Sequence, residues 1–124
     1  MRIFMTKWFL RWAARETLTD DTLLAAVKEI GRGLVDAGLG GHLVNKRIGT
    51  RGRGKSGSVR AVLAIQLGEK AFFIYGFSKN ERSNINEKEL KALKLLASEL
   101  LGYTDPTLEK VVKAGELIEV NING

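Results

Sequence analysis

The sequence predicts one α+β domain over residues 1–124, in which a small, mainly antiparallel sheet carries an N-terminal helical hairpin on one face and is followed by C-terminal helices. Three observations predict this order. Apolar residues recur at helical spacing in the first part of the chain, alternate as in strands in the middle part, and return to helical spacing near the end. A chain of 124 residues is long enough to bury one core.

The composition excludes several classes of protein. Hydrophobic residues make up 44% of the chain and charged residues 27%, which is ordinary for a folded domain. With no cysteine and a single histidine, His42, we expect no disulfide, no metal site, no cofactor and no histidine-based catalytic triad. The first residues do not resemble a secretory signal, and no stretch is apolar enough to span a membrane. We therefore expect a soluble, cytoplasmic protein without a membrane partner.

A short strand at Arg2–Met5 and two consecutive helices open the predicted fold. Thr6 is a suitable N-cap for the first helix, and Thr19, which two aspartates follow, is a suitable N-cap for the second. The second helix is expected to end near Gly38, with a glycine loop after it. The apolar residues at helical spacing are Trp8, Phe9, Trp12 and Ala13 in the first helix, and Leu23, Leu24, Val27, Ile30 and Leu34 in the second.

The two tryptophans, Trp8 and Trp12, allow two interpretations. Their spacing of four residues suits the packing of one helix face against a sheet, which is the more common use of such a pattern. Exposed rings at the same positions would instead form a stacking platform for nucleic-acid bases. We expect core packing for both.

The middle of the chain predicts three strands, at His42–Ile48, Val59–Leu67 and Lys70–Phe77. His42 has no serine or carboxylate near it in the sequence, so we expect it to be a loop or strand-edge residue. Gly68 starts a turn that fits a two-residue hairpin between the last two strands. The hairpin should therefore form a continuous antiparallel pair.

The predicted turn fixes the register of this hairpin. It pairs Leu67 with Lys70 and places Arg60 opposite Phe77. A slip of one residue would move every side chain to the other face. One side, the expected helix-packed core, then holds Ala61, Leu63, Ile65, Phe72 and Ile74, and the other side holds Arg60, Val62, Ala64, Phe73, Tyr75 and Phe77.

Two helices and a strand are predicted to complete the fold. Asn86 and Glu89 form an approximate capping box at the start of the third helix. An Asp-Pro pair at 105–106 opens a short fourth helix, which Gly115 closes before a last strand at Glu116–Val120. The apolar stripe of the third helix consists of Leu90, Leu93, Leu96, Ala97, Leu100 and Leu101.

A cationic stretch runs from Lys46 to Arg60, inside a longer segment, Ala37–Gly68, that contains no Asp or Glu. The whole chain has 20 basic and 14 acidic residues, so its formal net charge is +6. The cations of the stretch alone equal this excess, which indicates a phosphate-rich or otherwise polyanionic ligand. They are Lys46, Arg47, Arg51, Arg53, Lys55 and Arg60.

Two nucleotide-binding patterns occur formally in this stretch. Gly49–Ser56 matches the phosphate-binding loop of nucleotide hydrolases, and Gly52–Gly57 matches the dinucleotide fingerprint. Both patterns need a helix directly after the glycine-rich loop, because the helix N-terminus faces the phosphates. An alternating strand follows here instead. RNA is the better candidate ligand, with its phosphates on the cations and its bases against Tyr75 and Phe77.

The order and spacing of these motifs resemble the RelE/HigB superfamily of bacterial type II toxin–antitoxin toxins. The likeness is strongest from Lys46 to Leu101. It includes Gly-Arg-Gly-Lys-Ser-Gly-Ser-Val-Arg in the cationic stretch, Phe-Ile-Tyr-Gly-Phe at the end of the hairpin, and Ser-Lys-Asn-Glu-Arg after it. The resemblance implies a RelE-like fold and a ribosome-dependent endoribonuclease that cleaves mRNA by attack of a 2′-hydroxyl on the adjacent phosphate, without a metal ion. The implied partners are mRNA, the ribosome and a cognate antitoxin protein.

The resemblance also implies roles for single residues. The central arginine of the family falls on Arg60, and the two lysines that precede it fall on Arg51 and Arg53. The Lys-Arg-Glu-Arg turn of the family reads Lys79–Arg82 here, so one catalytic arginine is replaced by an asparagine. The base-stacking tyrosine falls on Asn86. The residues expected to be catalytic are Arg51, Arg53, Lys55, Arg60, Tyr75 and Arg82, and those expected to bind RNA are Lys46, Arg47, Phe77, Lys79 and Asn80.

The replaced residues leave two assignments open. Tyr75 or, as a weaker candidate, Tyr103 would have to stack on the base. Arginine is a poor general base because its pKa exceeds about 12. Lys55 or Lys46 is the better candidate, because neighbouring cations and partial desolvation lower a lysine pKa.

Two other functions stay open at this level. The ParE branch of the same fold inhibits DNA gyrase by binding and without cleavage, and the two replaced residues are compatible with it. A plain nucleic-acid-binding module would bind with a steep salt dependence and leave cells unharmed.

Overall fold

The computed structural model describes residues 1–35, 37–49, 58–82 and 84–121. These residues form a six-stranded sheet and four helices. No helix among them is long and apolar enough to cross a membrane. The strands are β1 (Arg2–Thr6), β2 (Ala37–Gly40), β3 (Leu43–Gly49), β4 (Ser58–Gln66), β5 (Lys70–Ser78) and β6 (Leu117–Glu119), and the helices are α1 (Lys7–Arg15), α2 (Asp20–Gly31), α3 (Glu87–Leu101) and α4 (Asp105–Lys113).

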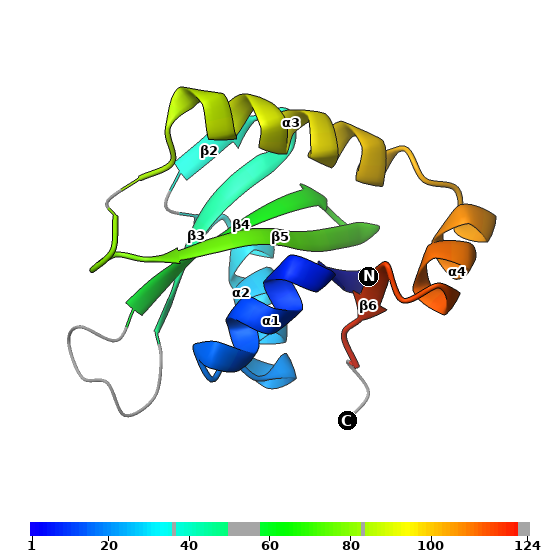
Figure 1. The fold of residues 1–124 in the computed structure, drawn as a ribbon, viewed down its shortest axis with the longest axis horizontal. Helices are drawn as coiled ribbons and strands as arrows, with labels where there is room; N and C mark the ends of the chain where they lie inside the picture. The colour runs from blue at the N-terminus through cyan, green and yellow to red at the C-terminus, as the bar shows by residue number, and fades with distance from the viewer. Residues whose placement is uncertain (36, 50–57, 83, 122–124) are drawn as a thin grey trace.

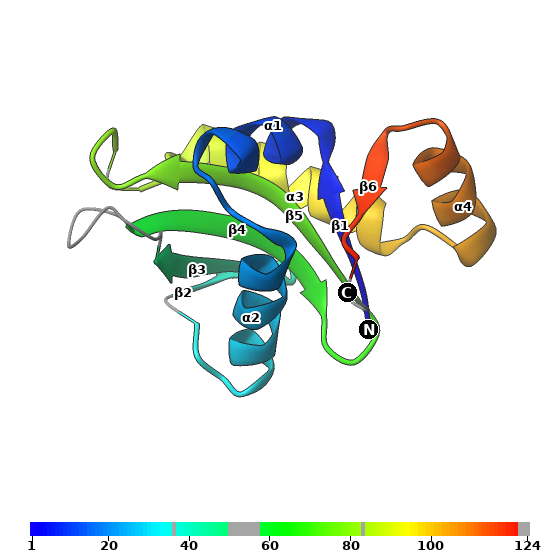
Figure 2. The same ribbon diagram turned by 90° about the horizontal axis from the view of Figure 1, so that it is seen from below.

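The sheet lies between two layers of helix. Its strand order is β2-β3-β4-β5-β1-β6, and only the β1–β5 pair is parallel among the described strands. Figures 1 and 2 show α1 and α2 on one face of the sheet, α3 across the other face, and α4 beside β6. We call the first face the α1/α2 face and the second the α3 face. The predicted α+β class and the mainly antiparallel sheet are confirmed.

The predicted helix starts are confirmed by their capping bonds. The Thr6 hydroxyl accepts a hydrogen bond from the Phe9 N–H at 3.1 Å, and the Thr19 hydroxyl accepts one from the Thr22 N–H at 3.2 Å. At α3 both bonds of the capping box form between Asn86 and Glu89. Side-chain oxygens at these positions satisfy helix N–H groups that would otherwise have no intrahelical partner.

The prediction that the second helix continues to near Gly38 is wrong. The helix α2 ends at Gly31, and Gly33 follows with a φ of 85°. Its N–H donates to the Ile30 carbonyl, and the Leu34 N–H donates to the Glu29 carbonyl, which together form a Schellman motif. Leu34 therefore lies outside the helix, with 54% of its surface exposed.

An unpredicted strand, β2, occupies the glycine-rich segment that was expected to be a loop. It pairs antiparallel with β3 through Gly40 and Leu43. The two residues between them, Gly41 and His42, both have positive φ angles, 60° and 65°. Two such residues are typical of the tight type I′ hairpin turn. His42 is thus a turn residue at the edge of the sheet.

The predicted β4–β5 register is wrong near the turn and right at the far end. The loop has three residues, so that Gln66 pairs with Lys70. A β-bulge at Ile74, between the pairs Leu63–Phe73 and Val62–Tyr75, then shifts the register by one residue. The two differences cancel, and Arg60 lies opposite Phe77 as predicted.

The bulge also changes which side chains share a face. Phe73 lies with Ala61 in the core of the α1/α2 face, not with Arg60 as predicted. Phe72 and Ile74 lie in the core of the α3 face, not beside Ala61. Both faces are covered by helices, so the expectation of a single helix-packed face was too simple.

The two tryptophans of α1 have different environments. Trp12 is 5% exposed and packs in the core of the α1/α2 face, as expected. Trp8 is 43% exposed, so the expectation of core packing is wrong for this residue. The backbone of Gly76 comes so close to Trp12 that a Cβ at this position would lie 2.2 Å from a carbon of the indole ring.

Candidate nucleic-acid interface

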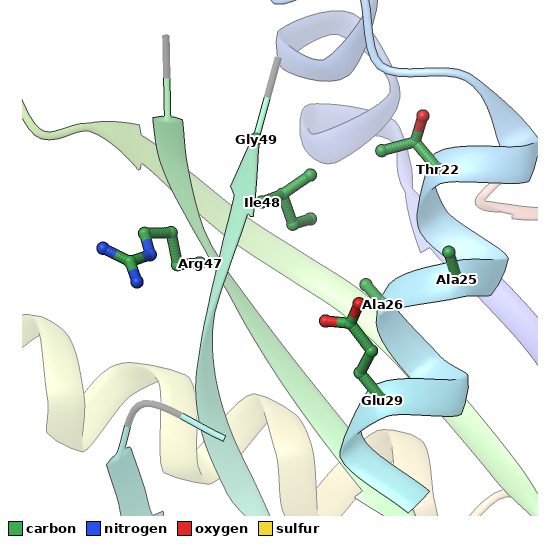
Figure 3. Close-up of a pocket in the computed structure, with 7 residues that line it drawn as sticks. All are labelled: Thr22, Ala25, Ala26, Glu29, Arg47, Ile48 and Gly49. Atoms are coloured by element: carbon green, nitrogen blue, oxygen red, sulfur yellow. The ribbon is translucent and has the colours of Figure 1, made fainter. Parts of the chain in front are cut away.

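The α3 face carries a row of side chains across three strands. Arg47 of β3 pairs with Arg60 of β4, and Arg60 pairs with Phe77 of β5. Residues paired directly across a sheet share a face, and Phe77 belongs to the core under α3. Figure 3 shows Arg47 pointing away from α2, whereas the neighbouring Ile48 points toward it. Two arginines and a phenylalanine thus lie side by side on the α3 face.

Arg60 has unsatisfied hydrogen-bonding capacity. Its Nη1 atom is buried and has no hydrogen-bond partner in the described part of the chain. The same holds for Oδ1 of Asn45, a residue that is only 7% exposed and lies two pairs further along the same face. An unpaired buried polar group typically destabilises a fold by about 1–3 kcal/mol. Such exceptions call for an explanation such as a ligand or catalytic role, and an anion with strong acceptors would satisfy Arg60.

A second cationic group, Arg82, lies on the Phe77 ring, with its Cζ 5.7 Å from the ring centroid. Its guanidinium forms a two-pronged ion pair with Glu89, in which Nη1 donates to Oε2 at 2.7 Å and Nη2 donates to Oε1. The Tyr75 hydroxyl donates to Oε2 of Glu89 at 3.3 Å and accepts a bond from Arg82 Nη1 at 3.4 Å. Glu89 therefore fixes Arg82 and Tyr75 relative to each other.

The charges in this cluster follow from these contacts. The Arg82 guanidinium and the Asn86 N–H lower the pKa of Glu89 to about 2. The hydrogen bond to Glu89 in turn raises the pKa of Arg82. Burial, and then the charge of Glu89, raise the pKa of Tyr75. At neutral pH the cluster thus contains a carboxylate, a guanidinium and a neutral phenol that keeps its proton.

The lowered pKa of Glu89 predicts a specific acid sensitivity. Because the folded value of about 2 lies below the unfolded value of about 4.3, ionised Glu89 stabilises the folded state above that pH, and this contribution is lost as the pH falls toward 2. We expect Glu89→Gln to flatten the dependence of the melting temperature on pH in this window. Glu87→Gln, which changes an exposed glutamate of the same turn, should keep the native slope. Equal slopes for native protein and Glu89→Gln would contradict this account.

Aromatic rings continue from Phe77 toward α1. The rings of Tyr75 and Phe77 lie 6.4 Å apart, and Trp8 stacks on Tyr75 at a centroid distance of 4.7 Å. Tyr75 is therefore covered on one side by Trp8, and its hydroxyl is bound by Glu89 and Arg82. The other candidate, Tyr103, lies near the opposite end of β5, where its backbone carbonyl accepts a hydrogen bond from the Lys70 ammonium at 2.9 Å.

Lys46 is not brought together with the other predicted site residues. It pairs with Ala61, whose side chain lies in the core of the α1/α2 face, and its Nζ contacts Oε1 of Glu29 in α2 at 2.7 Å. This contact lowers the pKa of Glu29. A small pocket between α2 and the end of β3 lies next to it, and Figure 3 shows Glu29 reaching toward the sheet there.

The other predicted residues lie in two places. Lys79 and Asn80 are exposed in the turn after β5, where the Asn80 N–H donates to the Ser78 hydroxyl. Asn86 caps α3 by accepting the Glu89 N–H at 2.8 Å. Arg51, Arg53 and Lys55 lie outside the described residues. Within the described part, the α3 face therefore brings together Arg47, Arg60, Tyr75, Phe77 and Arg82.

Sequence reasoning missed two members of this cluster. Glu89 was interpreted only as a capping residue, although an acid seven positions after an arginine and across a turn could also have been considered as its partner. Trp8 was assigned to the core with Trp12. Lys7 and Arg11, which flank Trp8 on the helix, are charged. These charges indicated that Trp8 lies at the margin of the buried side of the helix.

The chain was compared with models of protein families and with curated protein sequences. The family model described as the RelE toxin of the RelE/RelB toxin–antitoxin system matches residues 1–120. No curated protein sequence matches the chain.

Proposed function

Because the chain belongs to the RelE toxin family, and so is the toxin of a toxin–antitoxin system with a cognate antitoxin as its partner, we propose that it arrests growth by cleaving mRNA on the ribosome. The cleavage would occur on the α3 face, at the row of Arg47, Arg60 and Phe77. The antitoxin would act by keeping mRNA from this face.

The observation that carries this proposal is the unsatisfied guanidinium of Arg60. Its buried Nη1 has no partner among the described residues, and Arg47 lies next to it on the neighbouring strand. A guanidinium held in this way needs little reorganisation to bind a phosphate, and preorganised donors stabilise charge that develops in a transition state. Tyr75, which is partly exposed, supplies aromatic surface for a base beside that phosphate, whereas Phe77, predicted to contact a base, is only 3% exposed and lies in the core under Arg82.

The proposed reaction is a transesterification. The 2′-oxygen of one nucleotide attacks the adjacent phosphorus, the bond between phosphorus and the 5′-oxygen of the next nucleotide breaks, and a 2′,3′-cyclic phosphate and a 5′-hydroxyl form. One base accepts the 2′-hydroxyl proton and one acid gives a proton to the departing 5′-oxygen. Arg60 would hold the non-bridging oxygens, which carry the developing negative charge.

The contacts of the site favour particular residues for these roles. Lys46 is a poor candidate for the base, because its ammonium is paired with Glu29 on the opposite face of the sheet. Lys55 is then the preferred candidate. Tyr75 keeps its proton at neutral pH, because burial moves its pKa further up from its ordinary value, and Glu89 and Arg82 hold its hydroxyl in place. Tyr75 and Arg82 would form the wall of the site that contacts the base and the leaving nucleotide.

The proposal is tested by mapping new mRNA 5′ ends in growing cells after the protein is induced without its antitoxin. We expect new 5′ ends within translated reading frames, and their disappearance when translation initiation is blocked before induction. Growth arrest without any new 5′ end would refute the proposed RNA cleavage.

A gyrase-inhibiting toxin is the alternative, and one observation favours it. Asn86 stands where the related nucleases carry the base-stacking tyrosine, and here it is occupied as the N-cap of α3. Inhibition of DNA supercoiling by the purified protein, together with intact mRNA, would establish this alternative. Inhibition of neither process, with salt-sensitive RNA binding, would leave a plain binding module.

A further inference from the structure

One exposed aromatic ring is held rigidly at the edge of the proposed site. Trp8 is 43% exposed, although it stacks on Tyr75 with an angle of 26° between the rings and lies 6.2 Å from Trp12. Both neighbours are fixed, since Trp12 is buried and the Tyr75 hydroxyl is bound by Arg82 and Glu89. The exposed surface of Trp8 is thus presented to solvent in one orientation.

The helix that carries this ring is cationic. Its nine residues include Lys7, Arg11 and Arg15 and no acid. Arg11 and Arg15 follow Trp8 by three and seven positions, so they lie on the same side of α1. Lys7 contacts Glu116, whereas Arg11 and Arg15 are exposed and form no ion pair with any described residue. Phosphate groups beside Trp8 would therefore meet free positive charge.

The position of Trp8 connects it with the α3 face. The parallel pairing of β1 and β5 ends at Met5 and Phe73, and α1 begins two residues after Met5. Beyond Phe73, Trp8 of α1 lies along the same edge of β5 and stacks on Tyr75. Rings therefore follow one another from Phe77 under Arg82, through Tyr75, to Trp8.

From this arrangement we propose that Trp8 binds an unpaired nucleobase of the RNA strand next to the scissile phosphate, with Arg11 contacting the phosphate of that nucleotide. This binding site rests on the proposed function, because it takes the α3 face as the place where RNA is held. It extends the site around the edge of β5 onto α1. A single aromatic ring flanked by cations suits a base and its phosphate.

A helix of a protein partner fits this surface less well. Such a helix usually binds by placing apolar side chains, spaced three or four residues apart, into an apolar groove of its partner. The exposed side of α1 around Trp8 carries the charged residues Arg11 and Arg15 instead of an apolar groove. The antitoxin is therefore an outcome that the test must distinguish, and RNA is the occupant that the charges favour.

The test uses tryptophan fluorescence, because the chain has only two tryptophans. In Trp12→Phe, Trp8 is the sole tryptophan. We expect a short single-stranded 2′-O-methyl oligoribonucleotide, which cannot be cleaved through its 2′-oxygen, to quench it in a saturable and salt-sensitive way. Inorganic tripolyphosphate should compete for the cations without quenching. In Trp8→Phe the remaining indole is buried, so its emission should not change.

Affinity measurements give the size of the effect. Stacking of one base on an aromatic side chain is worth about 1–3 kcal/mol, so Trp8→Ala should weaken oligonucleotide binding by about 5- to 150-fold. Trp8→Phe should retain most of the affinity. In cleavage assays Trp8→Ala should raise KM more than it lowers kcat. Arg11→Gln should reduce the salt dependence of binding.

A second measurement guards against a folding defect in Trp12→Phe. The otherwise native chain labelled with 5-fluorotryptophan gives two fluorine resonances, and the oligonucleotide should shift that of Trp8. A Trp8 response to the oligonucleotide without any cleavage would keep Trp8 as a binding site for an unpaired base and remove the proposed nuclease activity. Cleavage with no Trp8 response and an unchanged KM in Trp8→Ala would overturn the inference alone. A Trp8 response to the antitoxin but not to RNA would also overturn it.

Discussion

Replacement of Arg60 by methionine should reduce the single-turnover rate of mRNA cleavage by at least about 100-fold, which is the usual effect of removing one preorganised donor from a transition state. Methionine keeps most of the aliphatic length of arginine and its packing beside Phe77, but it has no guanidinium. Because Nη1 of Arg60 is buried without a partner among the described residues, its removal should not lower the free energy of unfolding. Rate and stability are measured on the same preparation.

Lys46→Met is the matched control for this experiment. It removes one positive charge from the neighbouring strand, but on the α1/α2 face, where Lys46 is paired with Glu29. We expect its cleavage rate to remain within about threefold of the native rate, since its ammonium is paired with Glu29 on the face of the sheet opposite to Arg60. Equal losses in the two variants would mean that the net charge, and not the α3 face, determines the activity. An active Arg60→Met protein would contradict the role assigned to Arg60.

Gly76→Ala should be the most destabilising small substitution in the described part of the sheet. The new Cβ would lie 2.2, 2.4 and 2.6 Å from three carbons of the Trp12 indole, closer than any van der Waals contact. Trp12 is buried against Phe9 and cannot move aside. Overpacking of this kind typically costs about 1–3 kcal/mol, and we expect a loss at the upper end of that range or beyond in urea denaturation.

Two controls separate this clash from a general effect of alanine. Gly31→Ala, at the end of α2, adds a Cβ with nothing within 4 Å and should leave stability unchanged or slightly higher. Trp12→Leu should relieve the clash, so that Gly76→Ala costs much less in that background than in the native chain. Additive effects of the two substitutions would show that the indole is not the cause.

Local signals in the sequence predicted most of the helices. Thr6, Thr19 and the pair Asn86–Glu89 carry side chains that cap helices by hydrogen bonds to groups only three residues away. Such bonds join residues that are close in the sequence, so the local sequence is enough to predict them. The end of α2 also had a local signal, Gly33, but the apolar residues after it made the helix seem longer.

The sheet was harder to predict because its register depends on tertiary packing. The isolated Gly76 in Phe-Ile-Tyr-Gly-Phe indicates an irregular strand, because such a glycine suggests a bulge or a close backbone approach, but it does not mark Ile74 as the bulged residue. Because of the bulge, Gly76 lies against the Trp12 ring on the α1/α2 face, while Phe77 lies opposite Arg60 on the α3 face. The strand β2 was missed because glycine-rich segments have low strand propensity, and its pairing with β3 decides its conformation.

The sequence indicated the charges of the candidate site, but not which side chains contact one another there. The acid-free cationic stretch directed attention to Arg60 and Arg47, which pair on neighbouring strands of the sheet. Because successive side chains of a strand point to opposite faces, Lys46 and Arg47 cannot share a face. The sequence could not indicate which of them lies with Arg60, because a strand buried on both sides has no clear polar alternation. The contacts of Glu89 with Arg82 and Tyr75 join a helix, a turn and a strand, so they became visible only in the fold.

The most direct test of the central claim is the chemistry of the RNA ends formed in a purified translation system. A reporter mRNA is translated with the native protein, with Lys46→Met, or with Arg60→Met, and the fragments are sequenced at both ends. We predict fragments with 5′-hydroxyl and 2′,3′-cyclic phosphate ends from the first two proteins, and intact mRNA with the third. Translation that stops while the mRNA stays intact, or fragments with 5′-phosphate ends, would contradict this account.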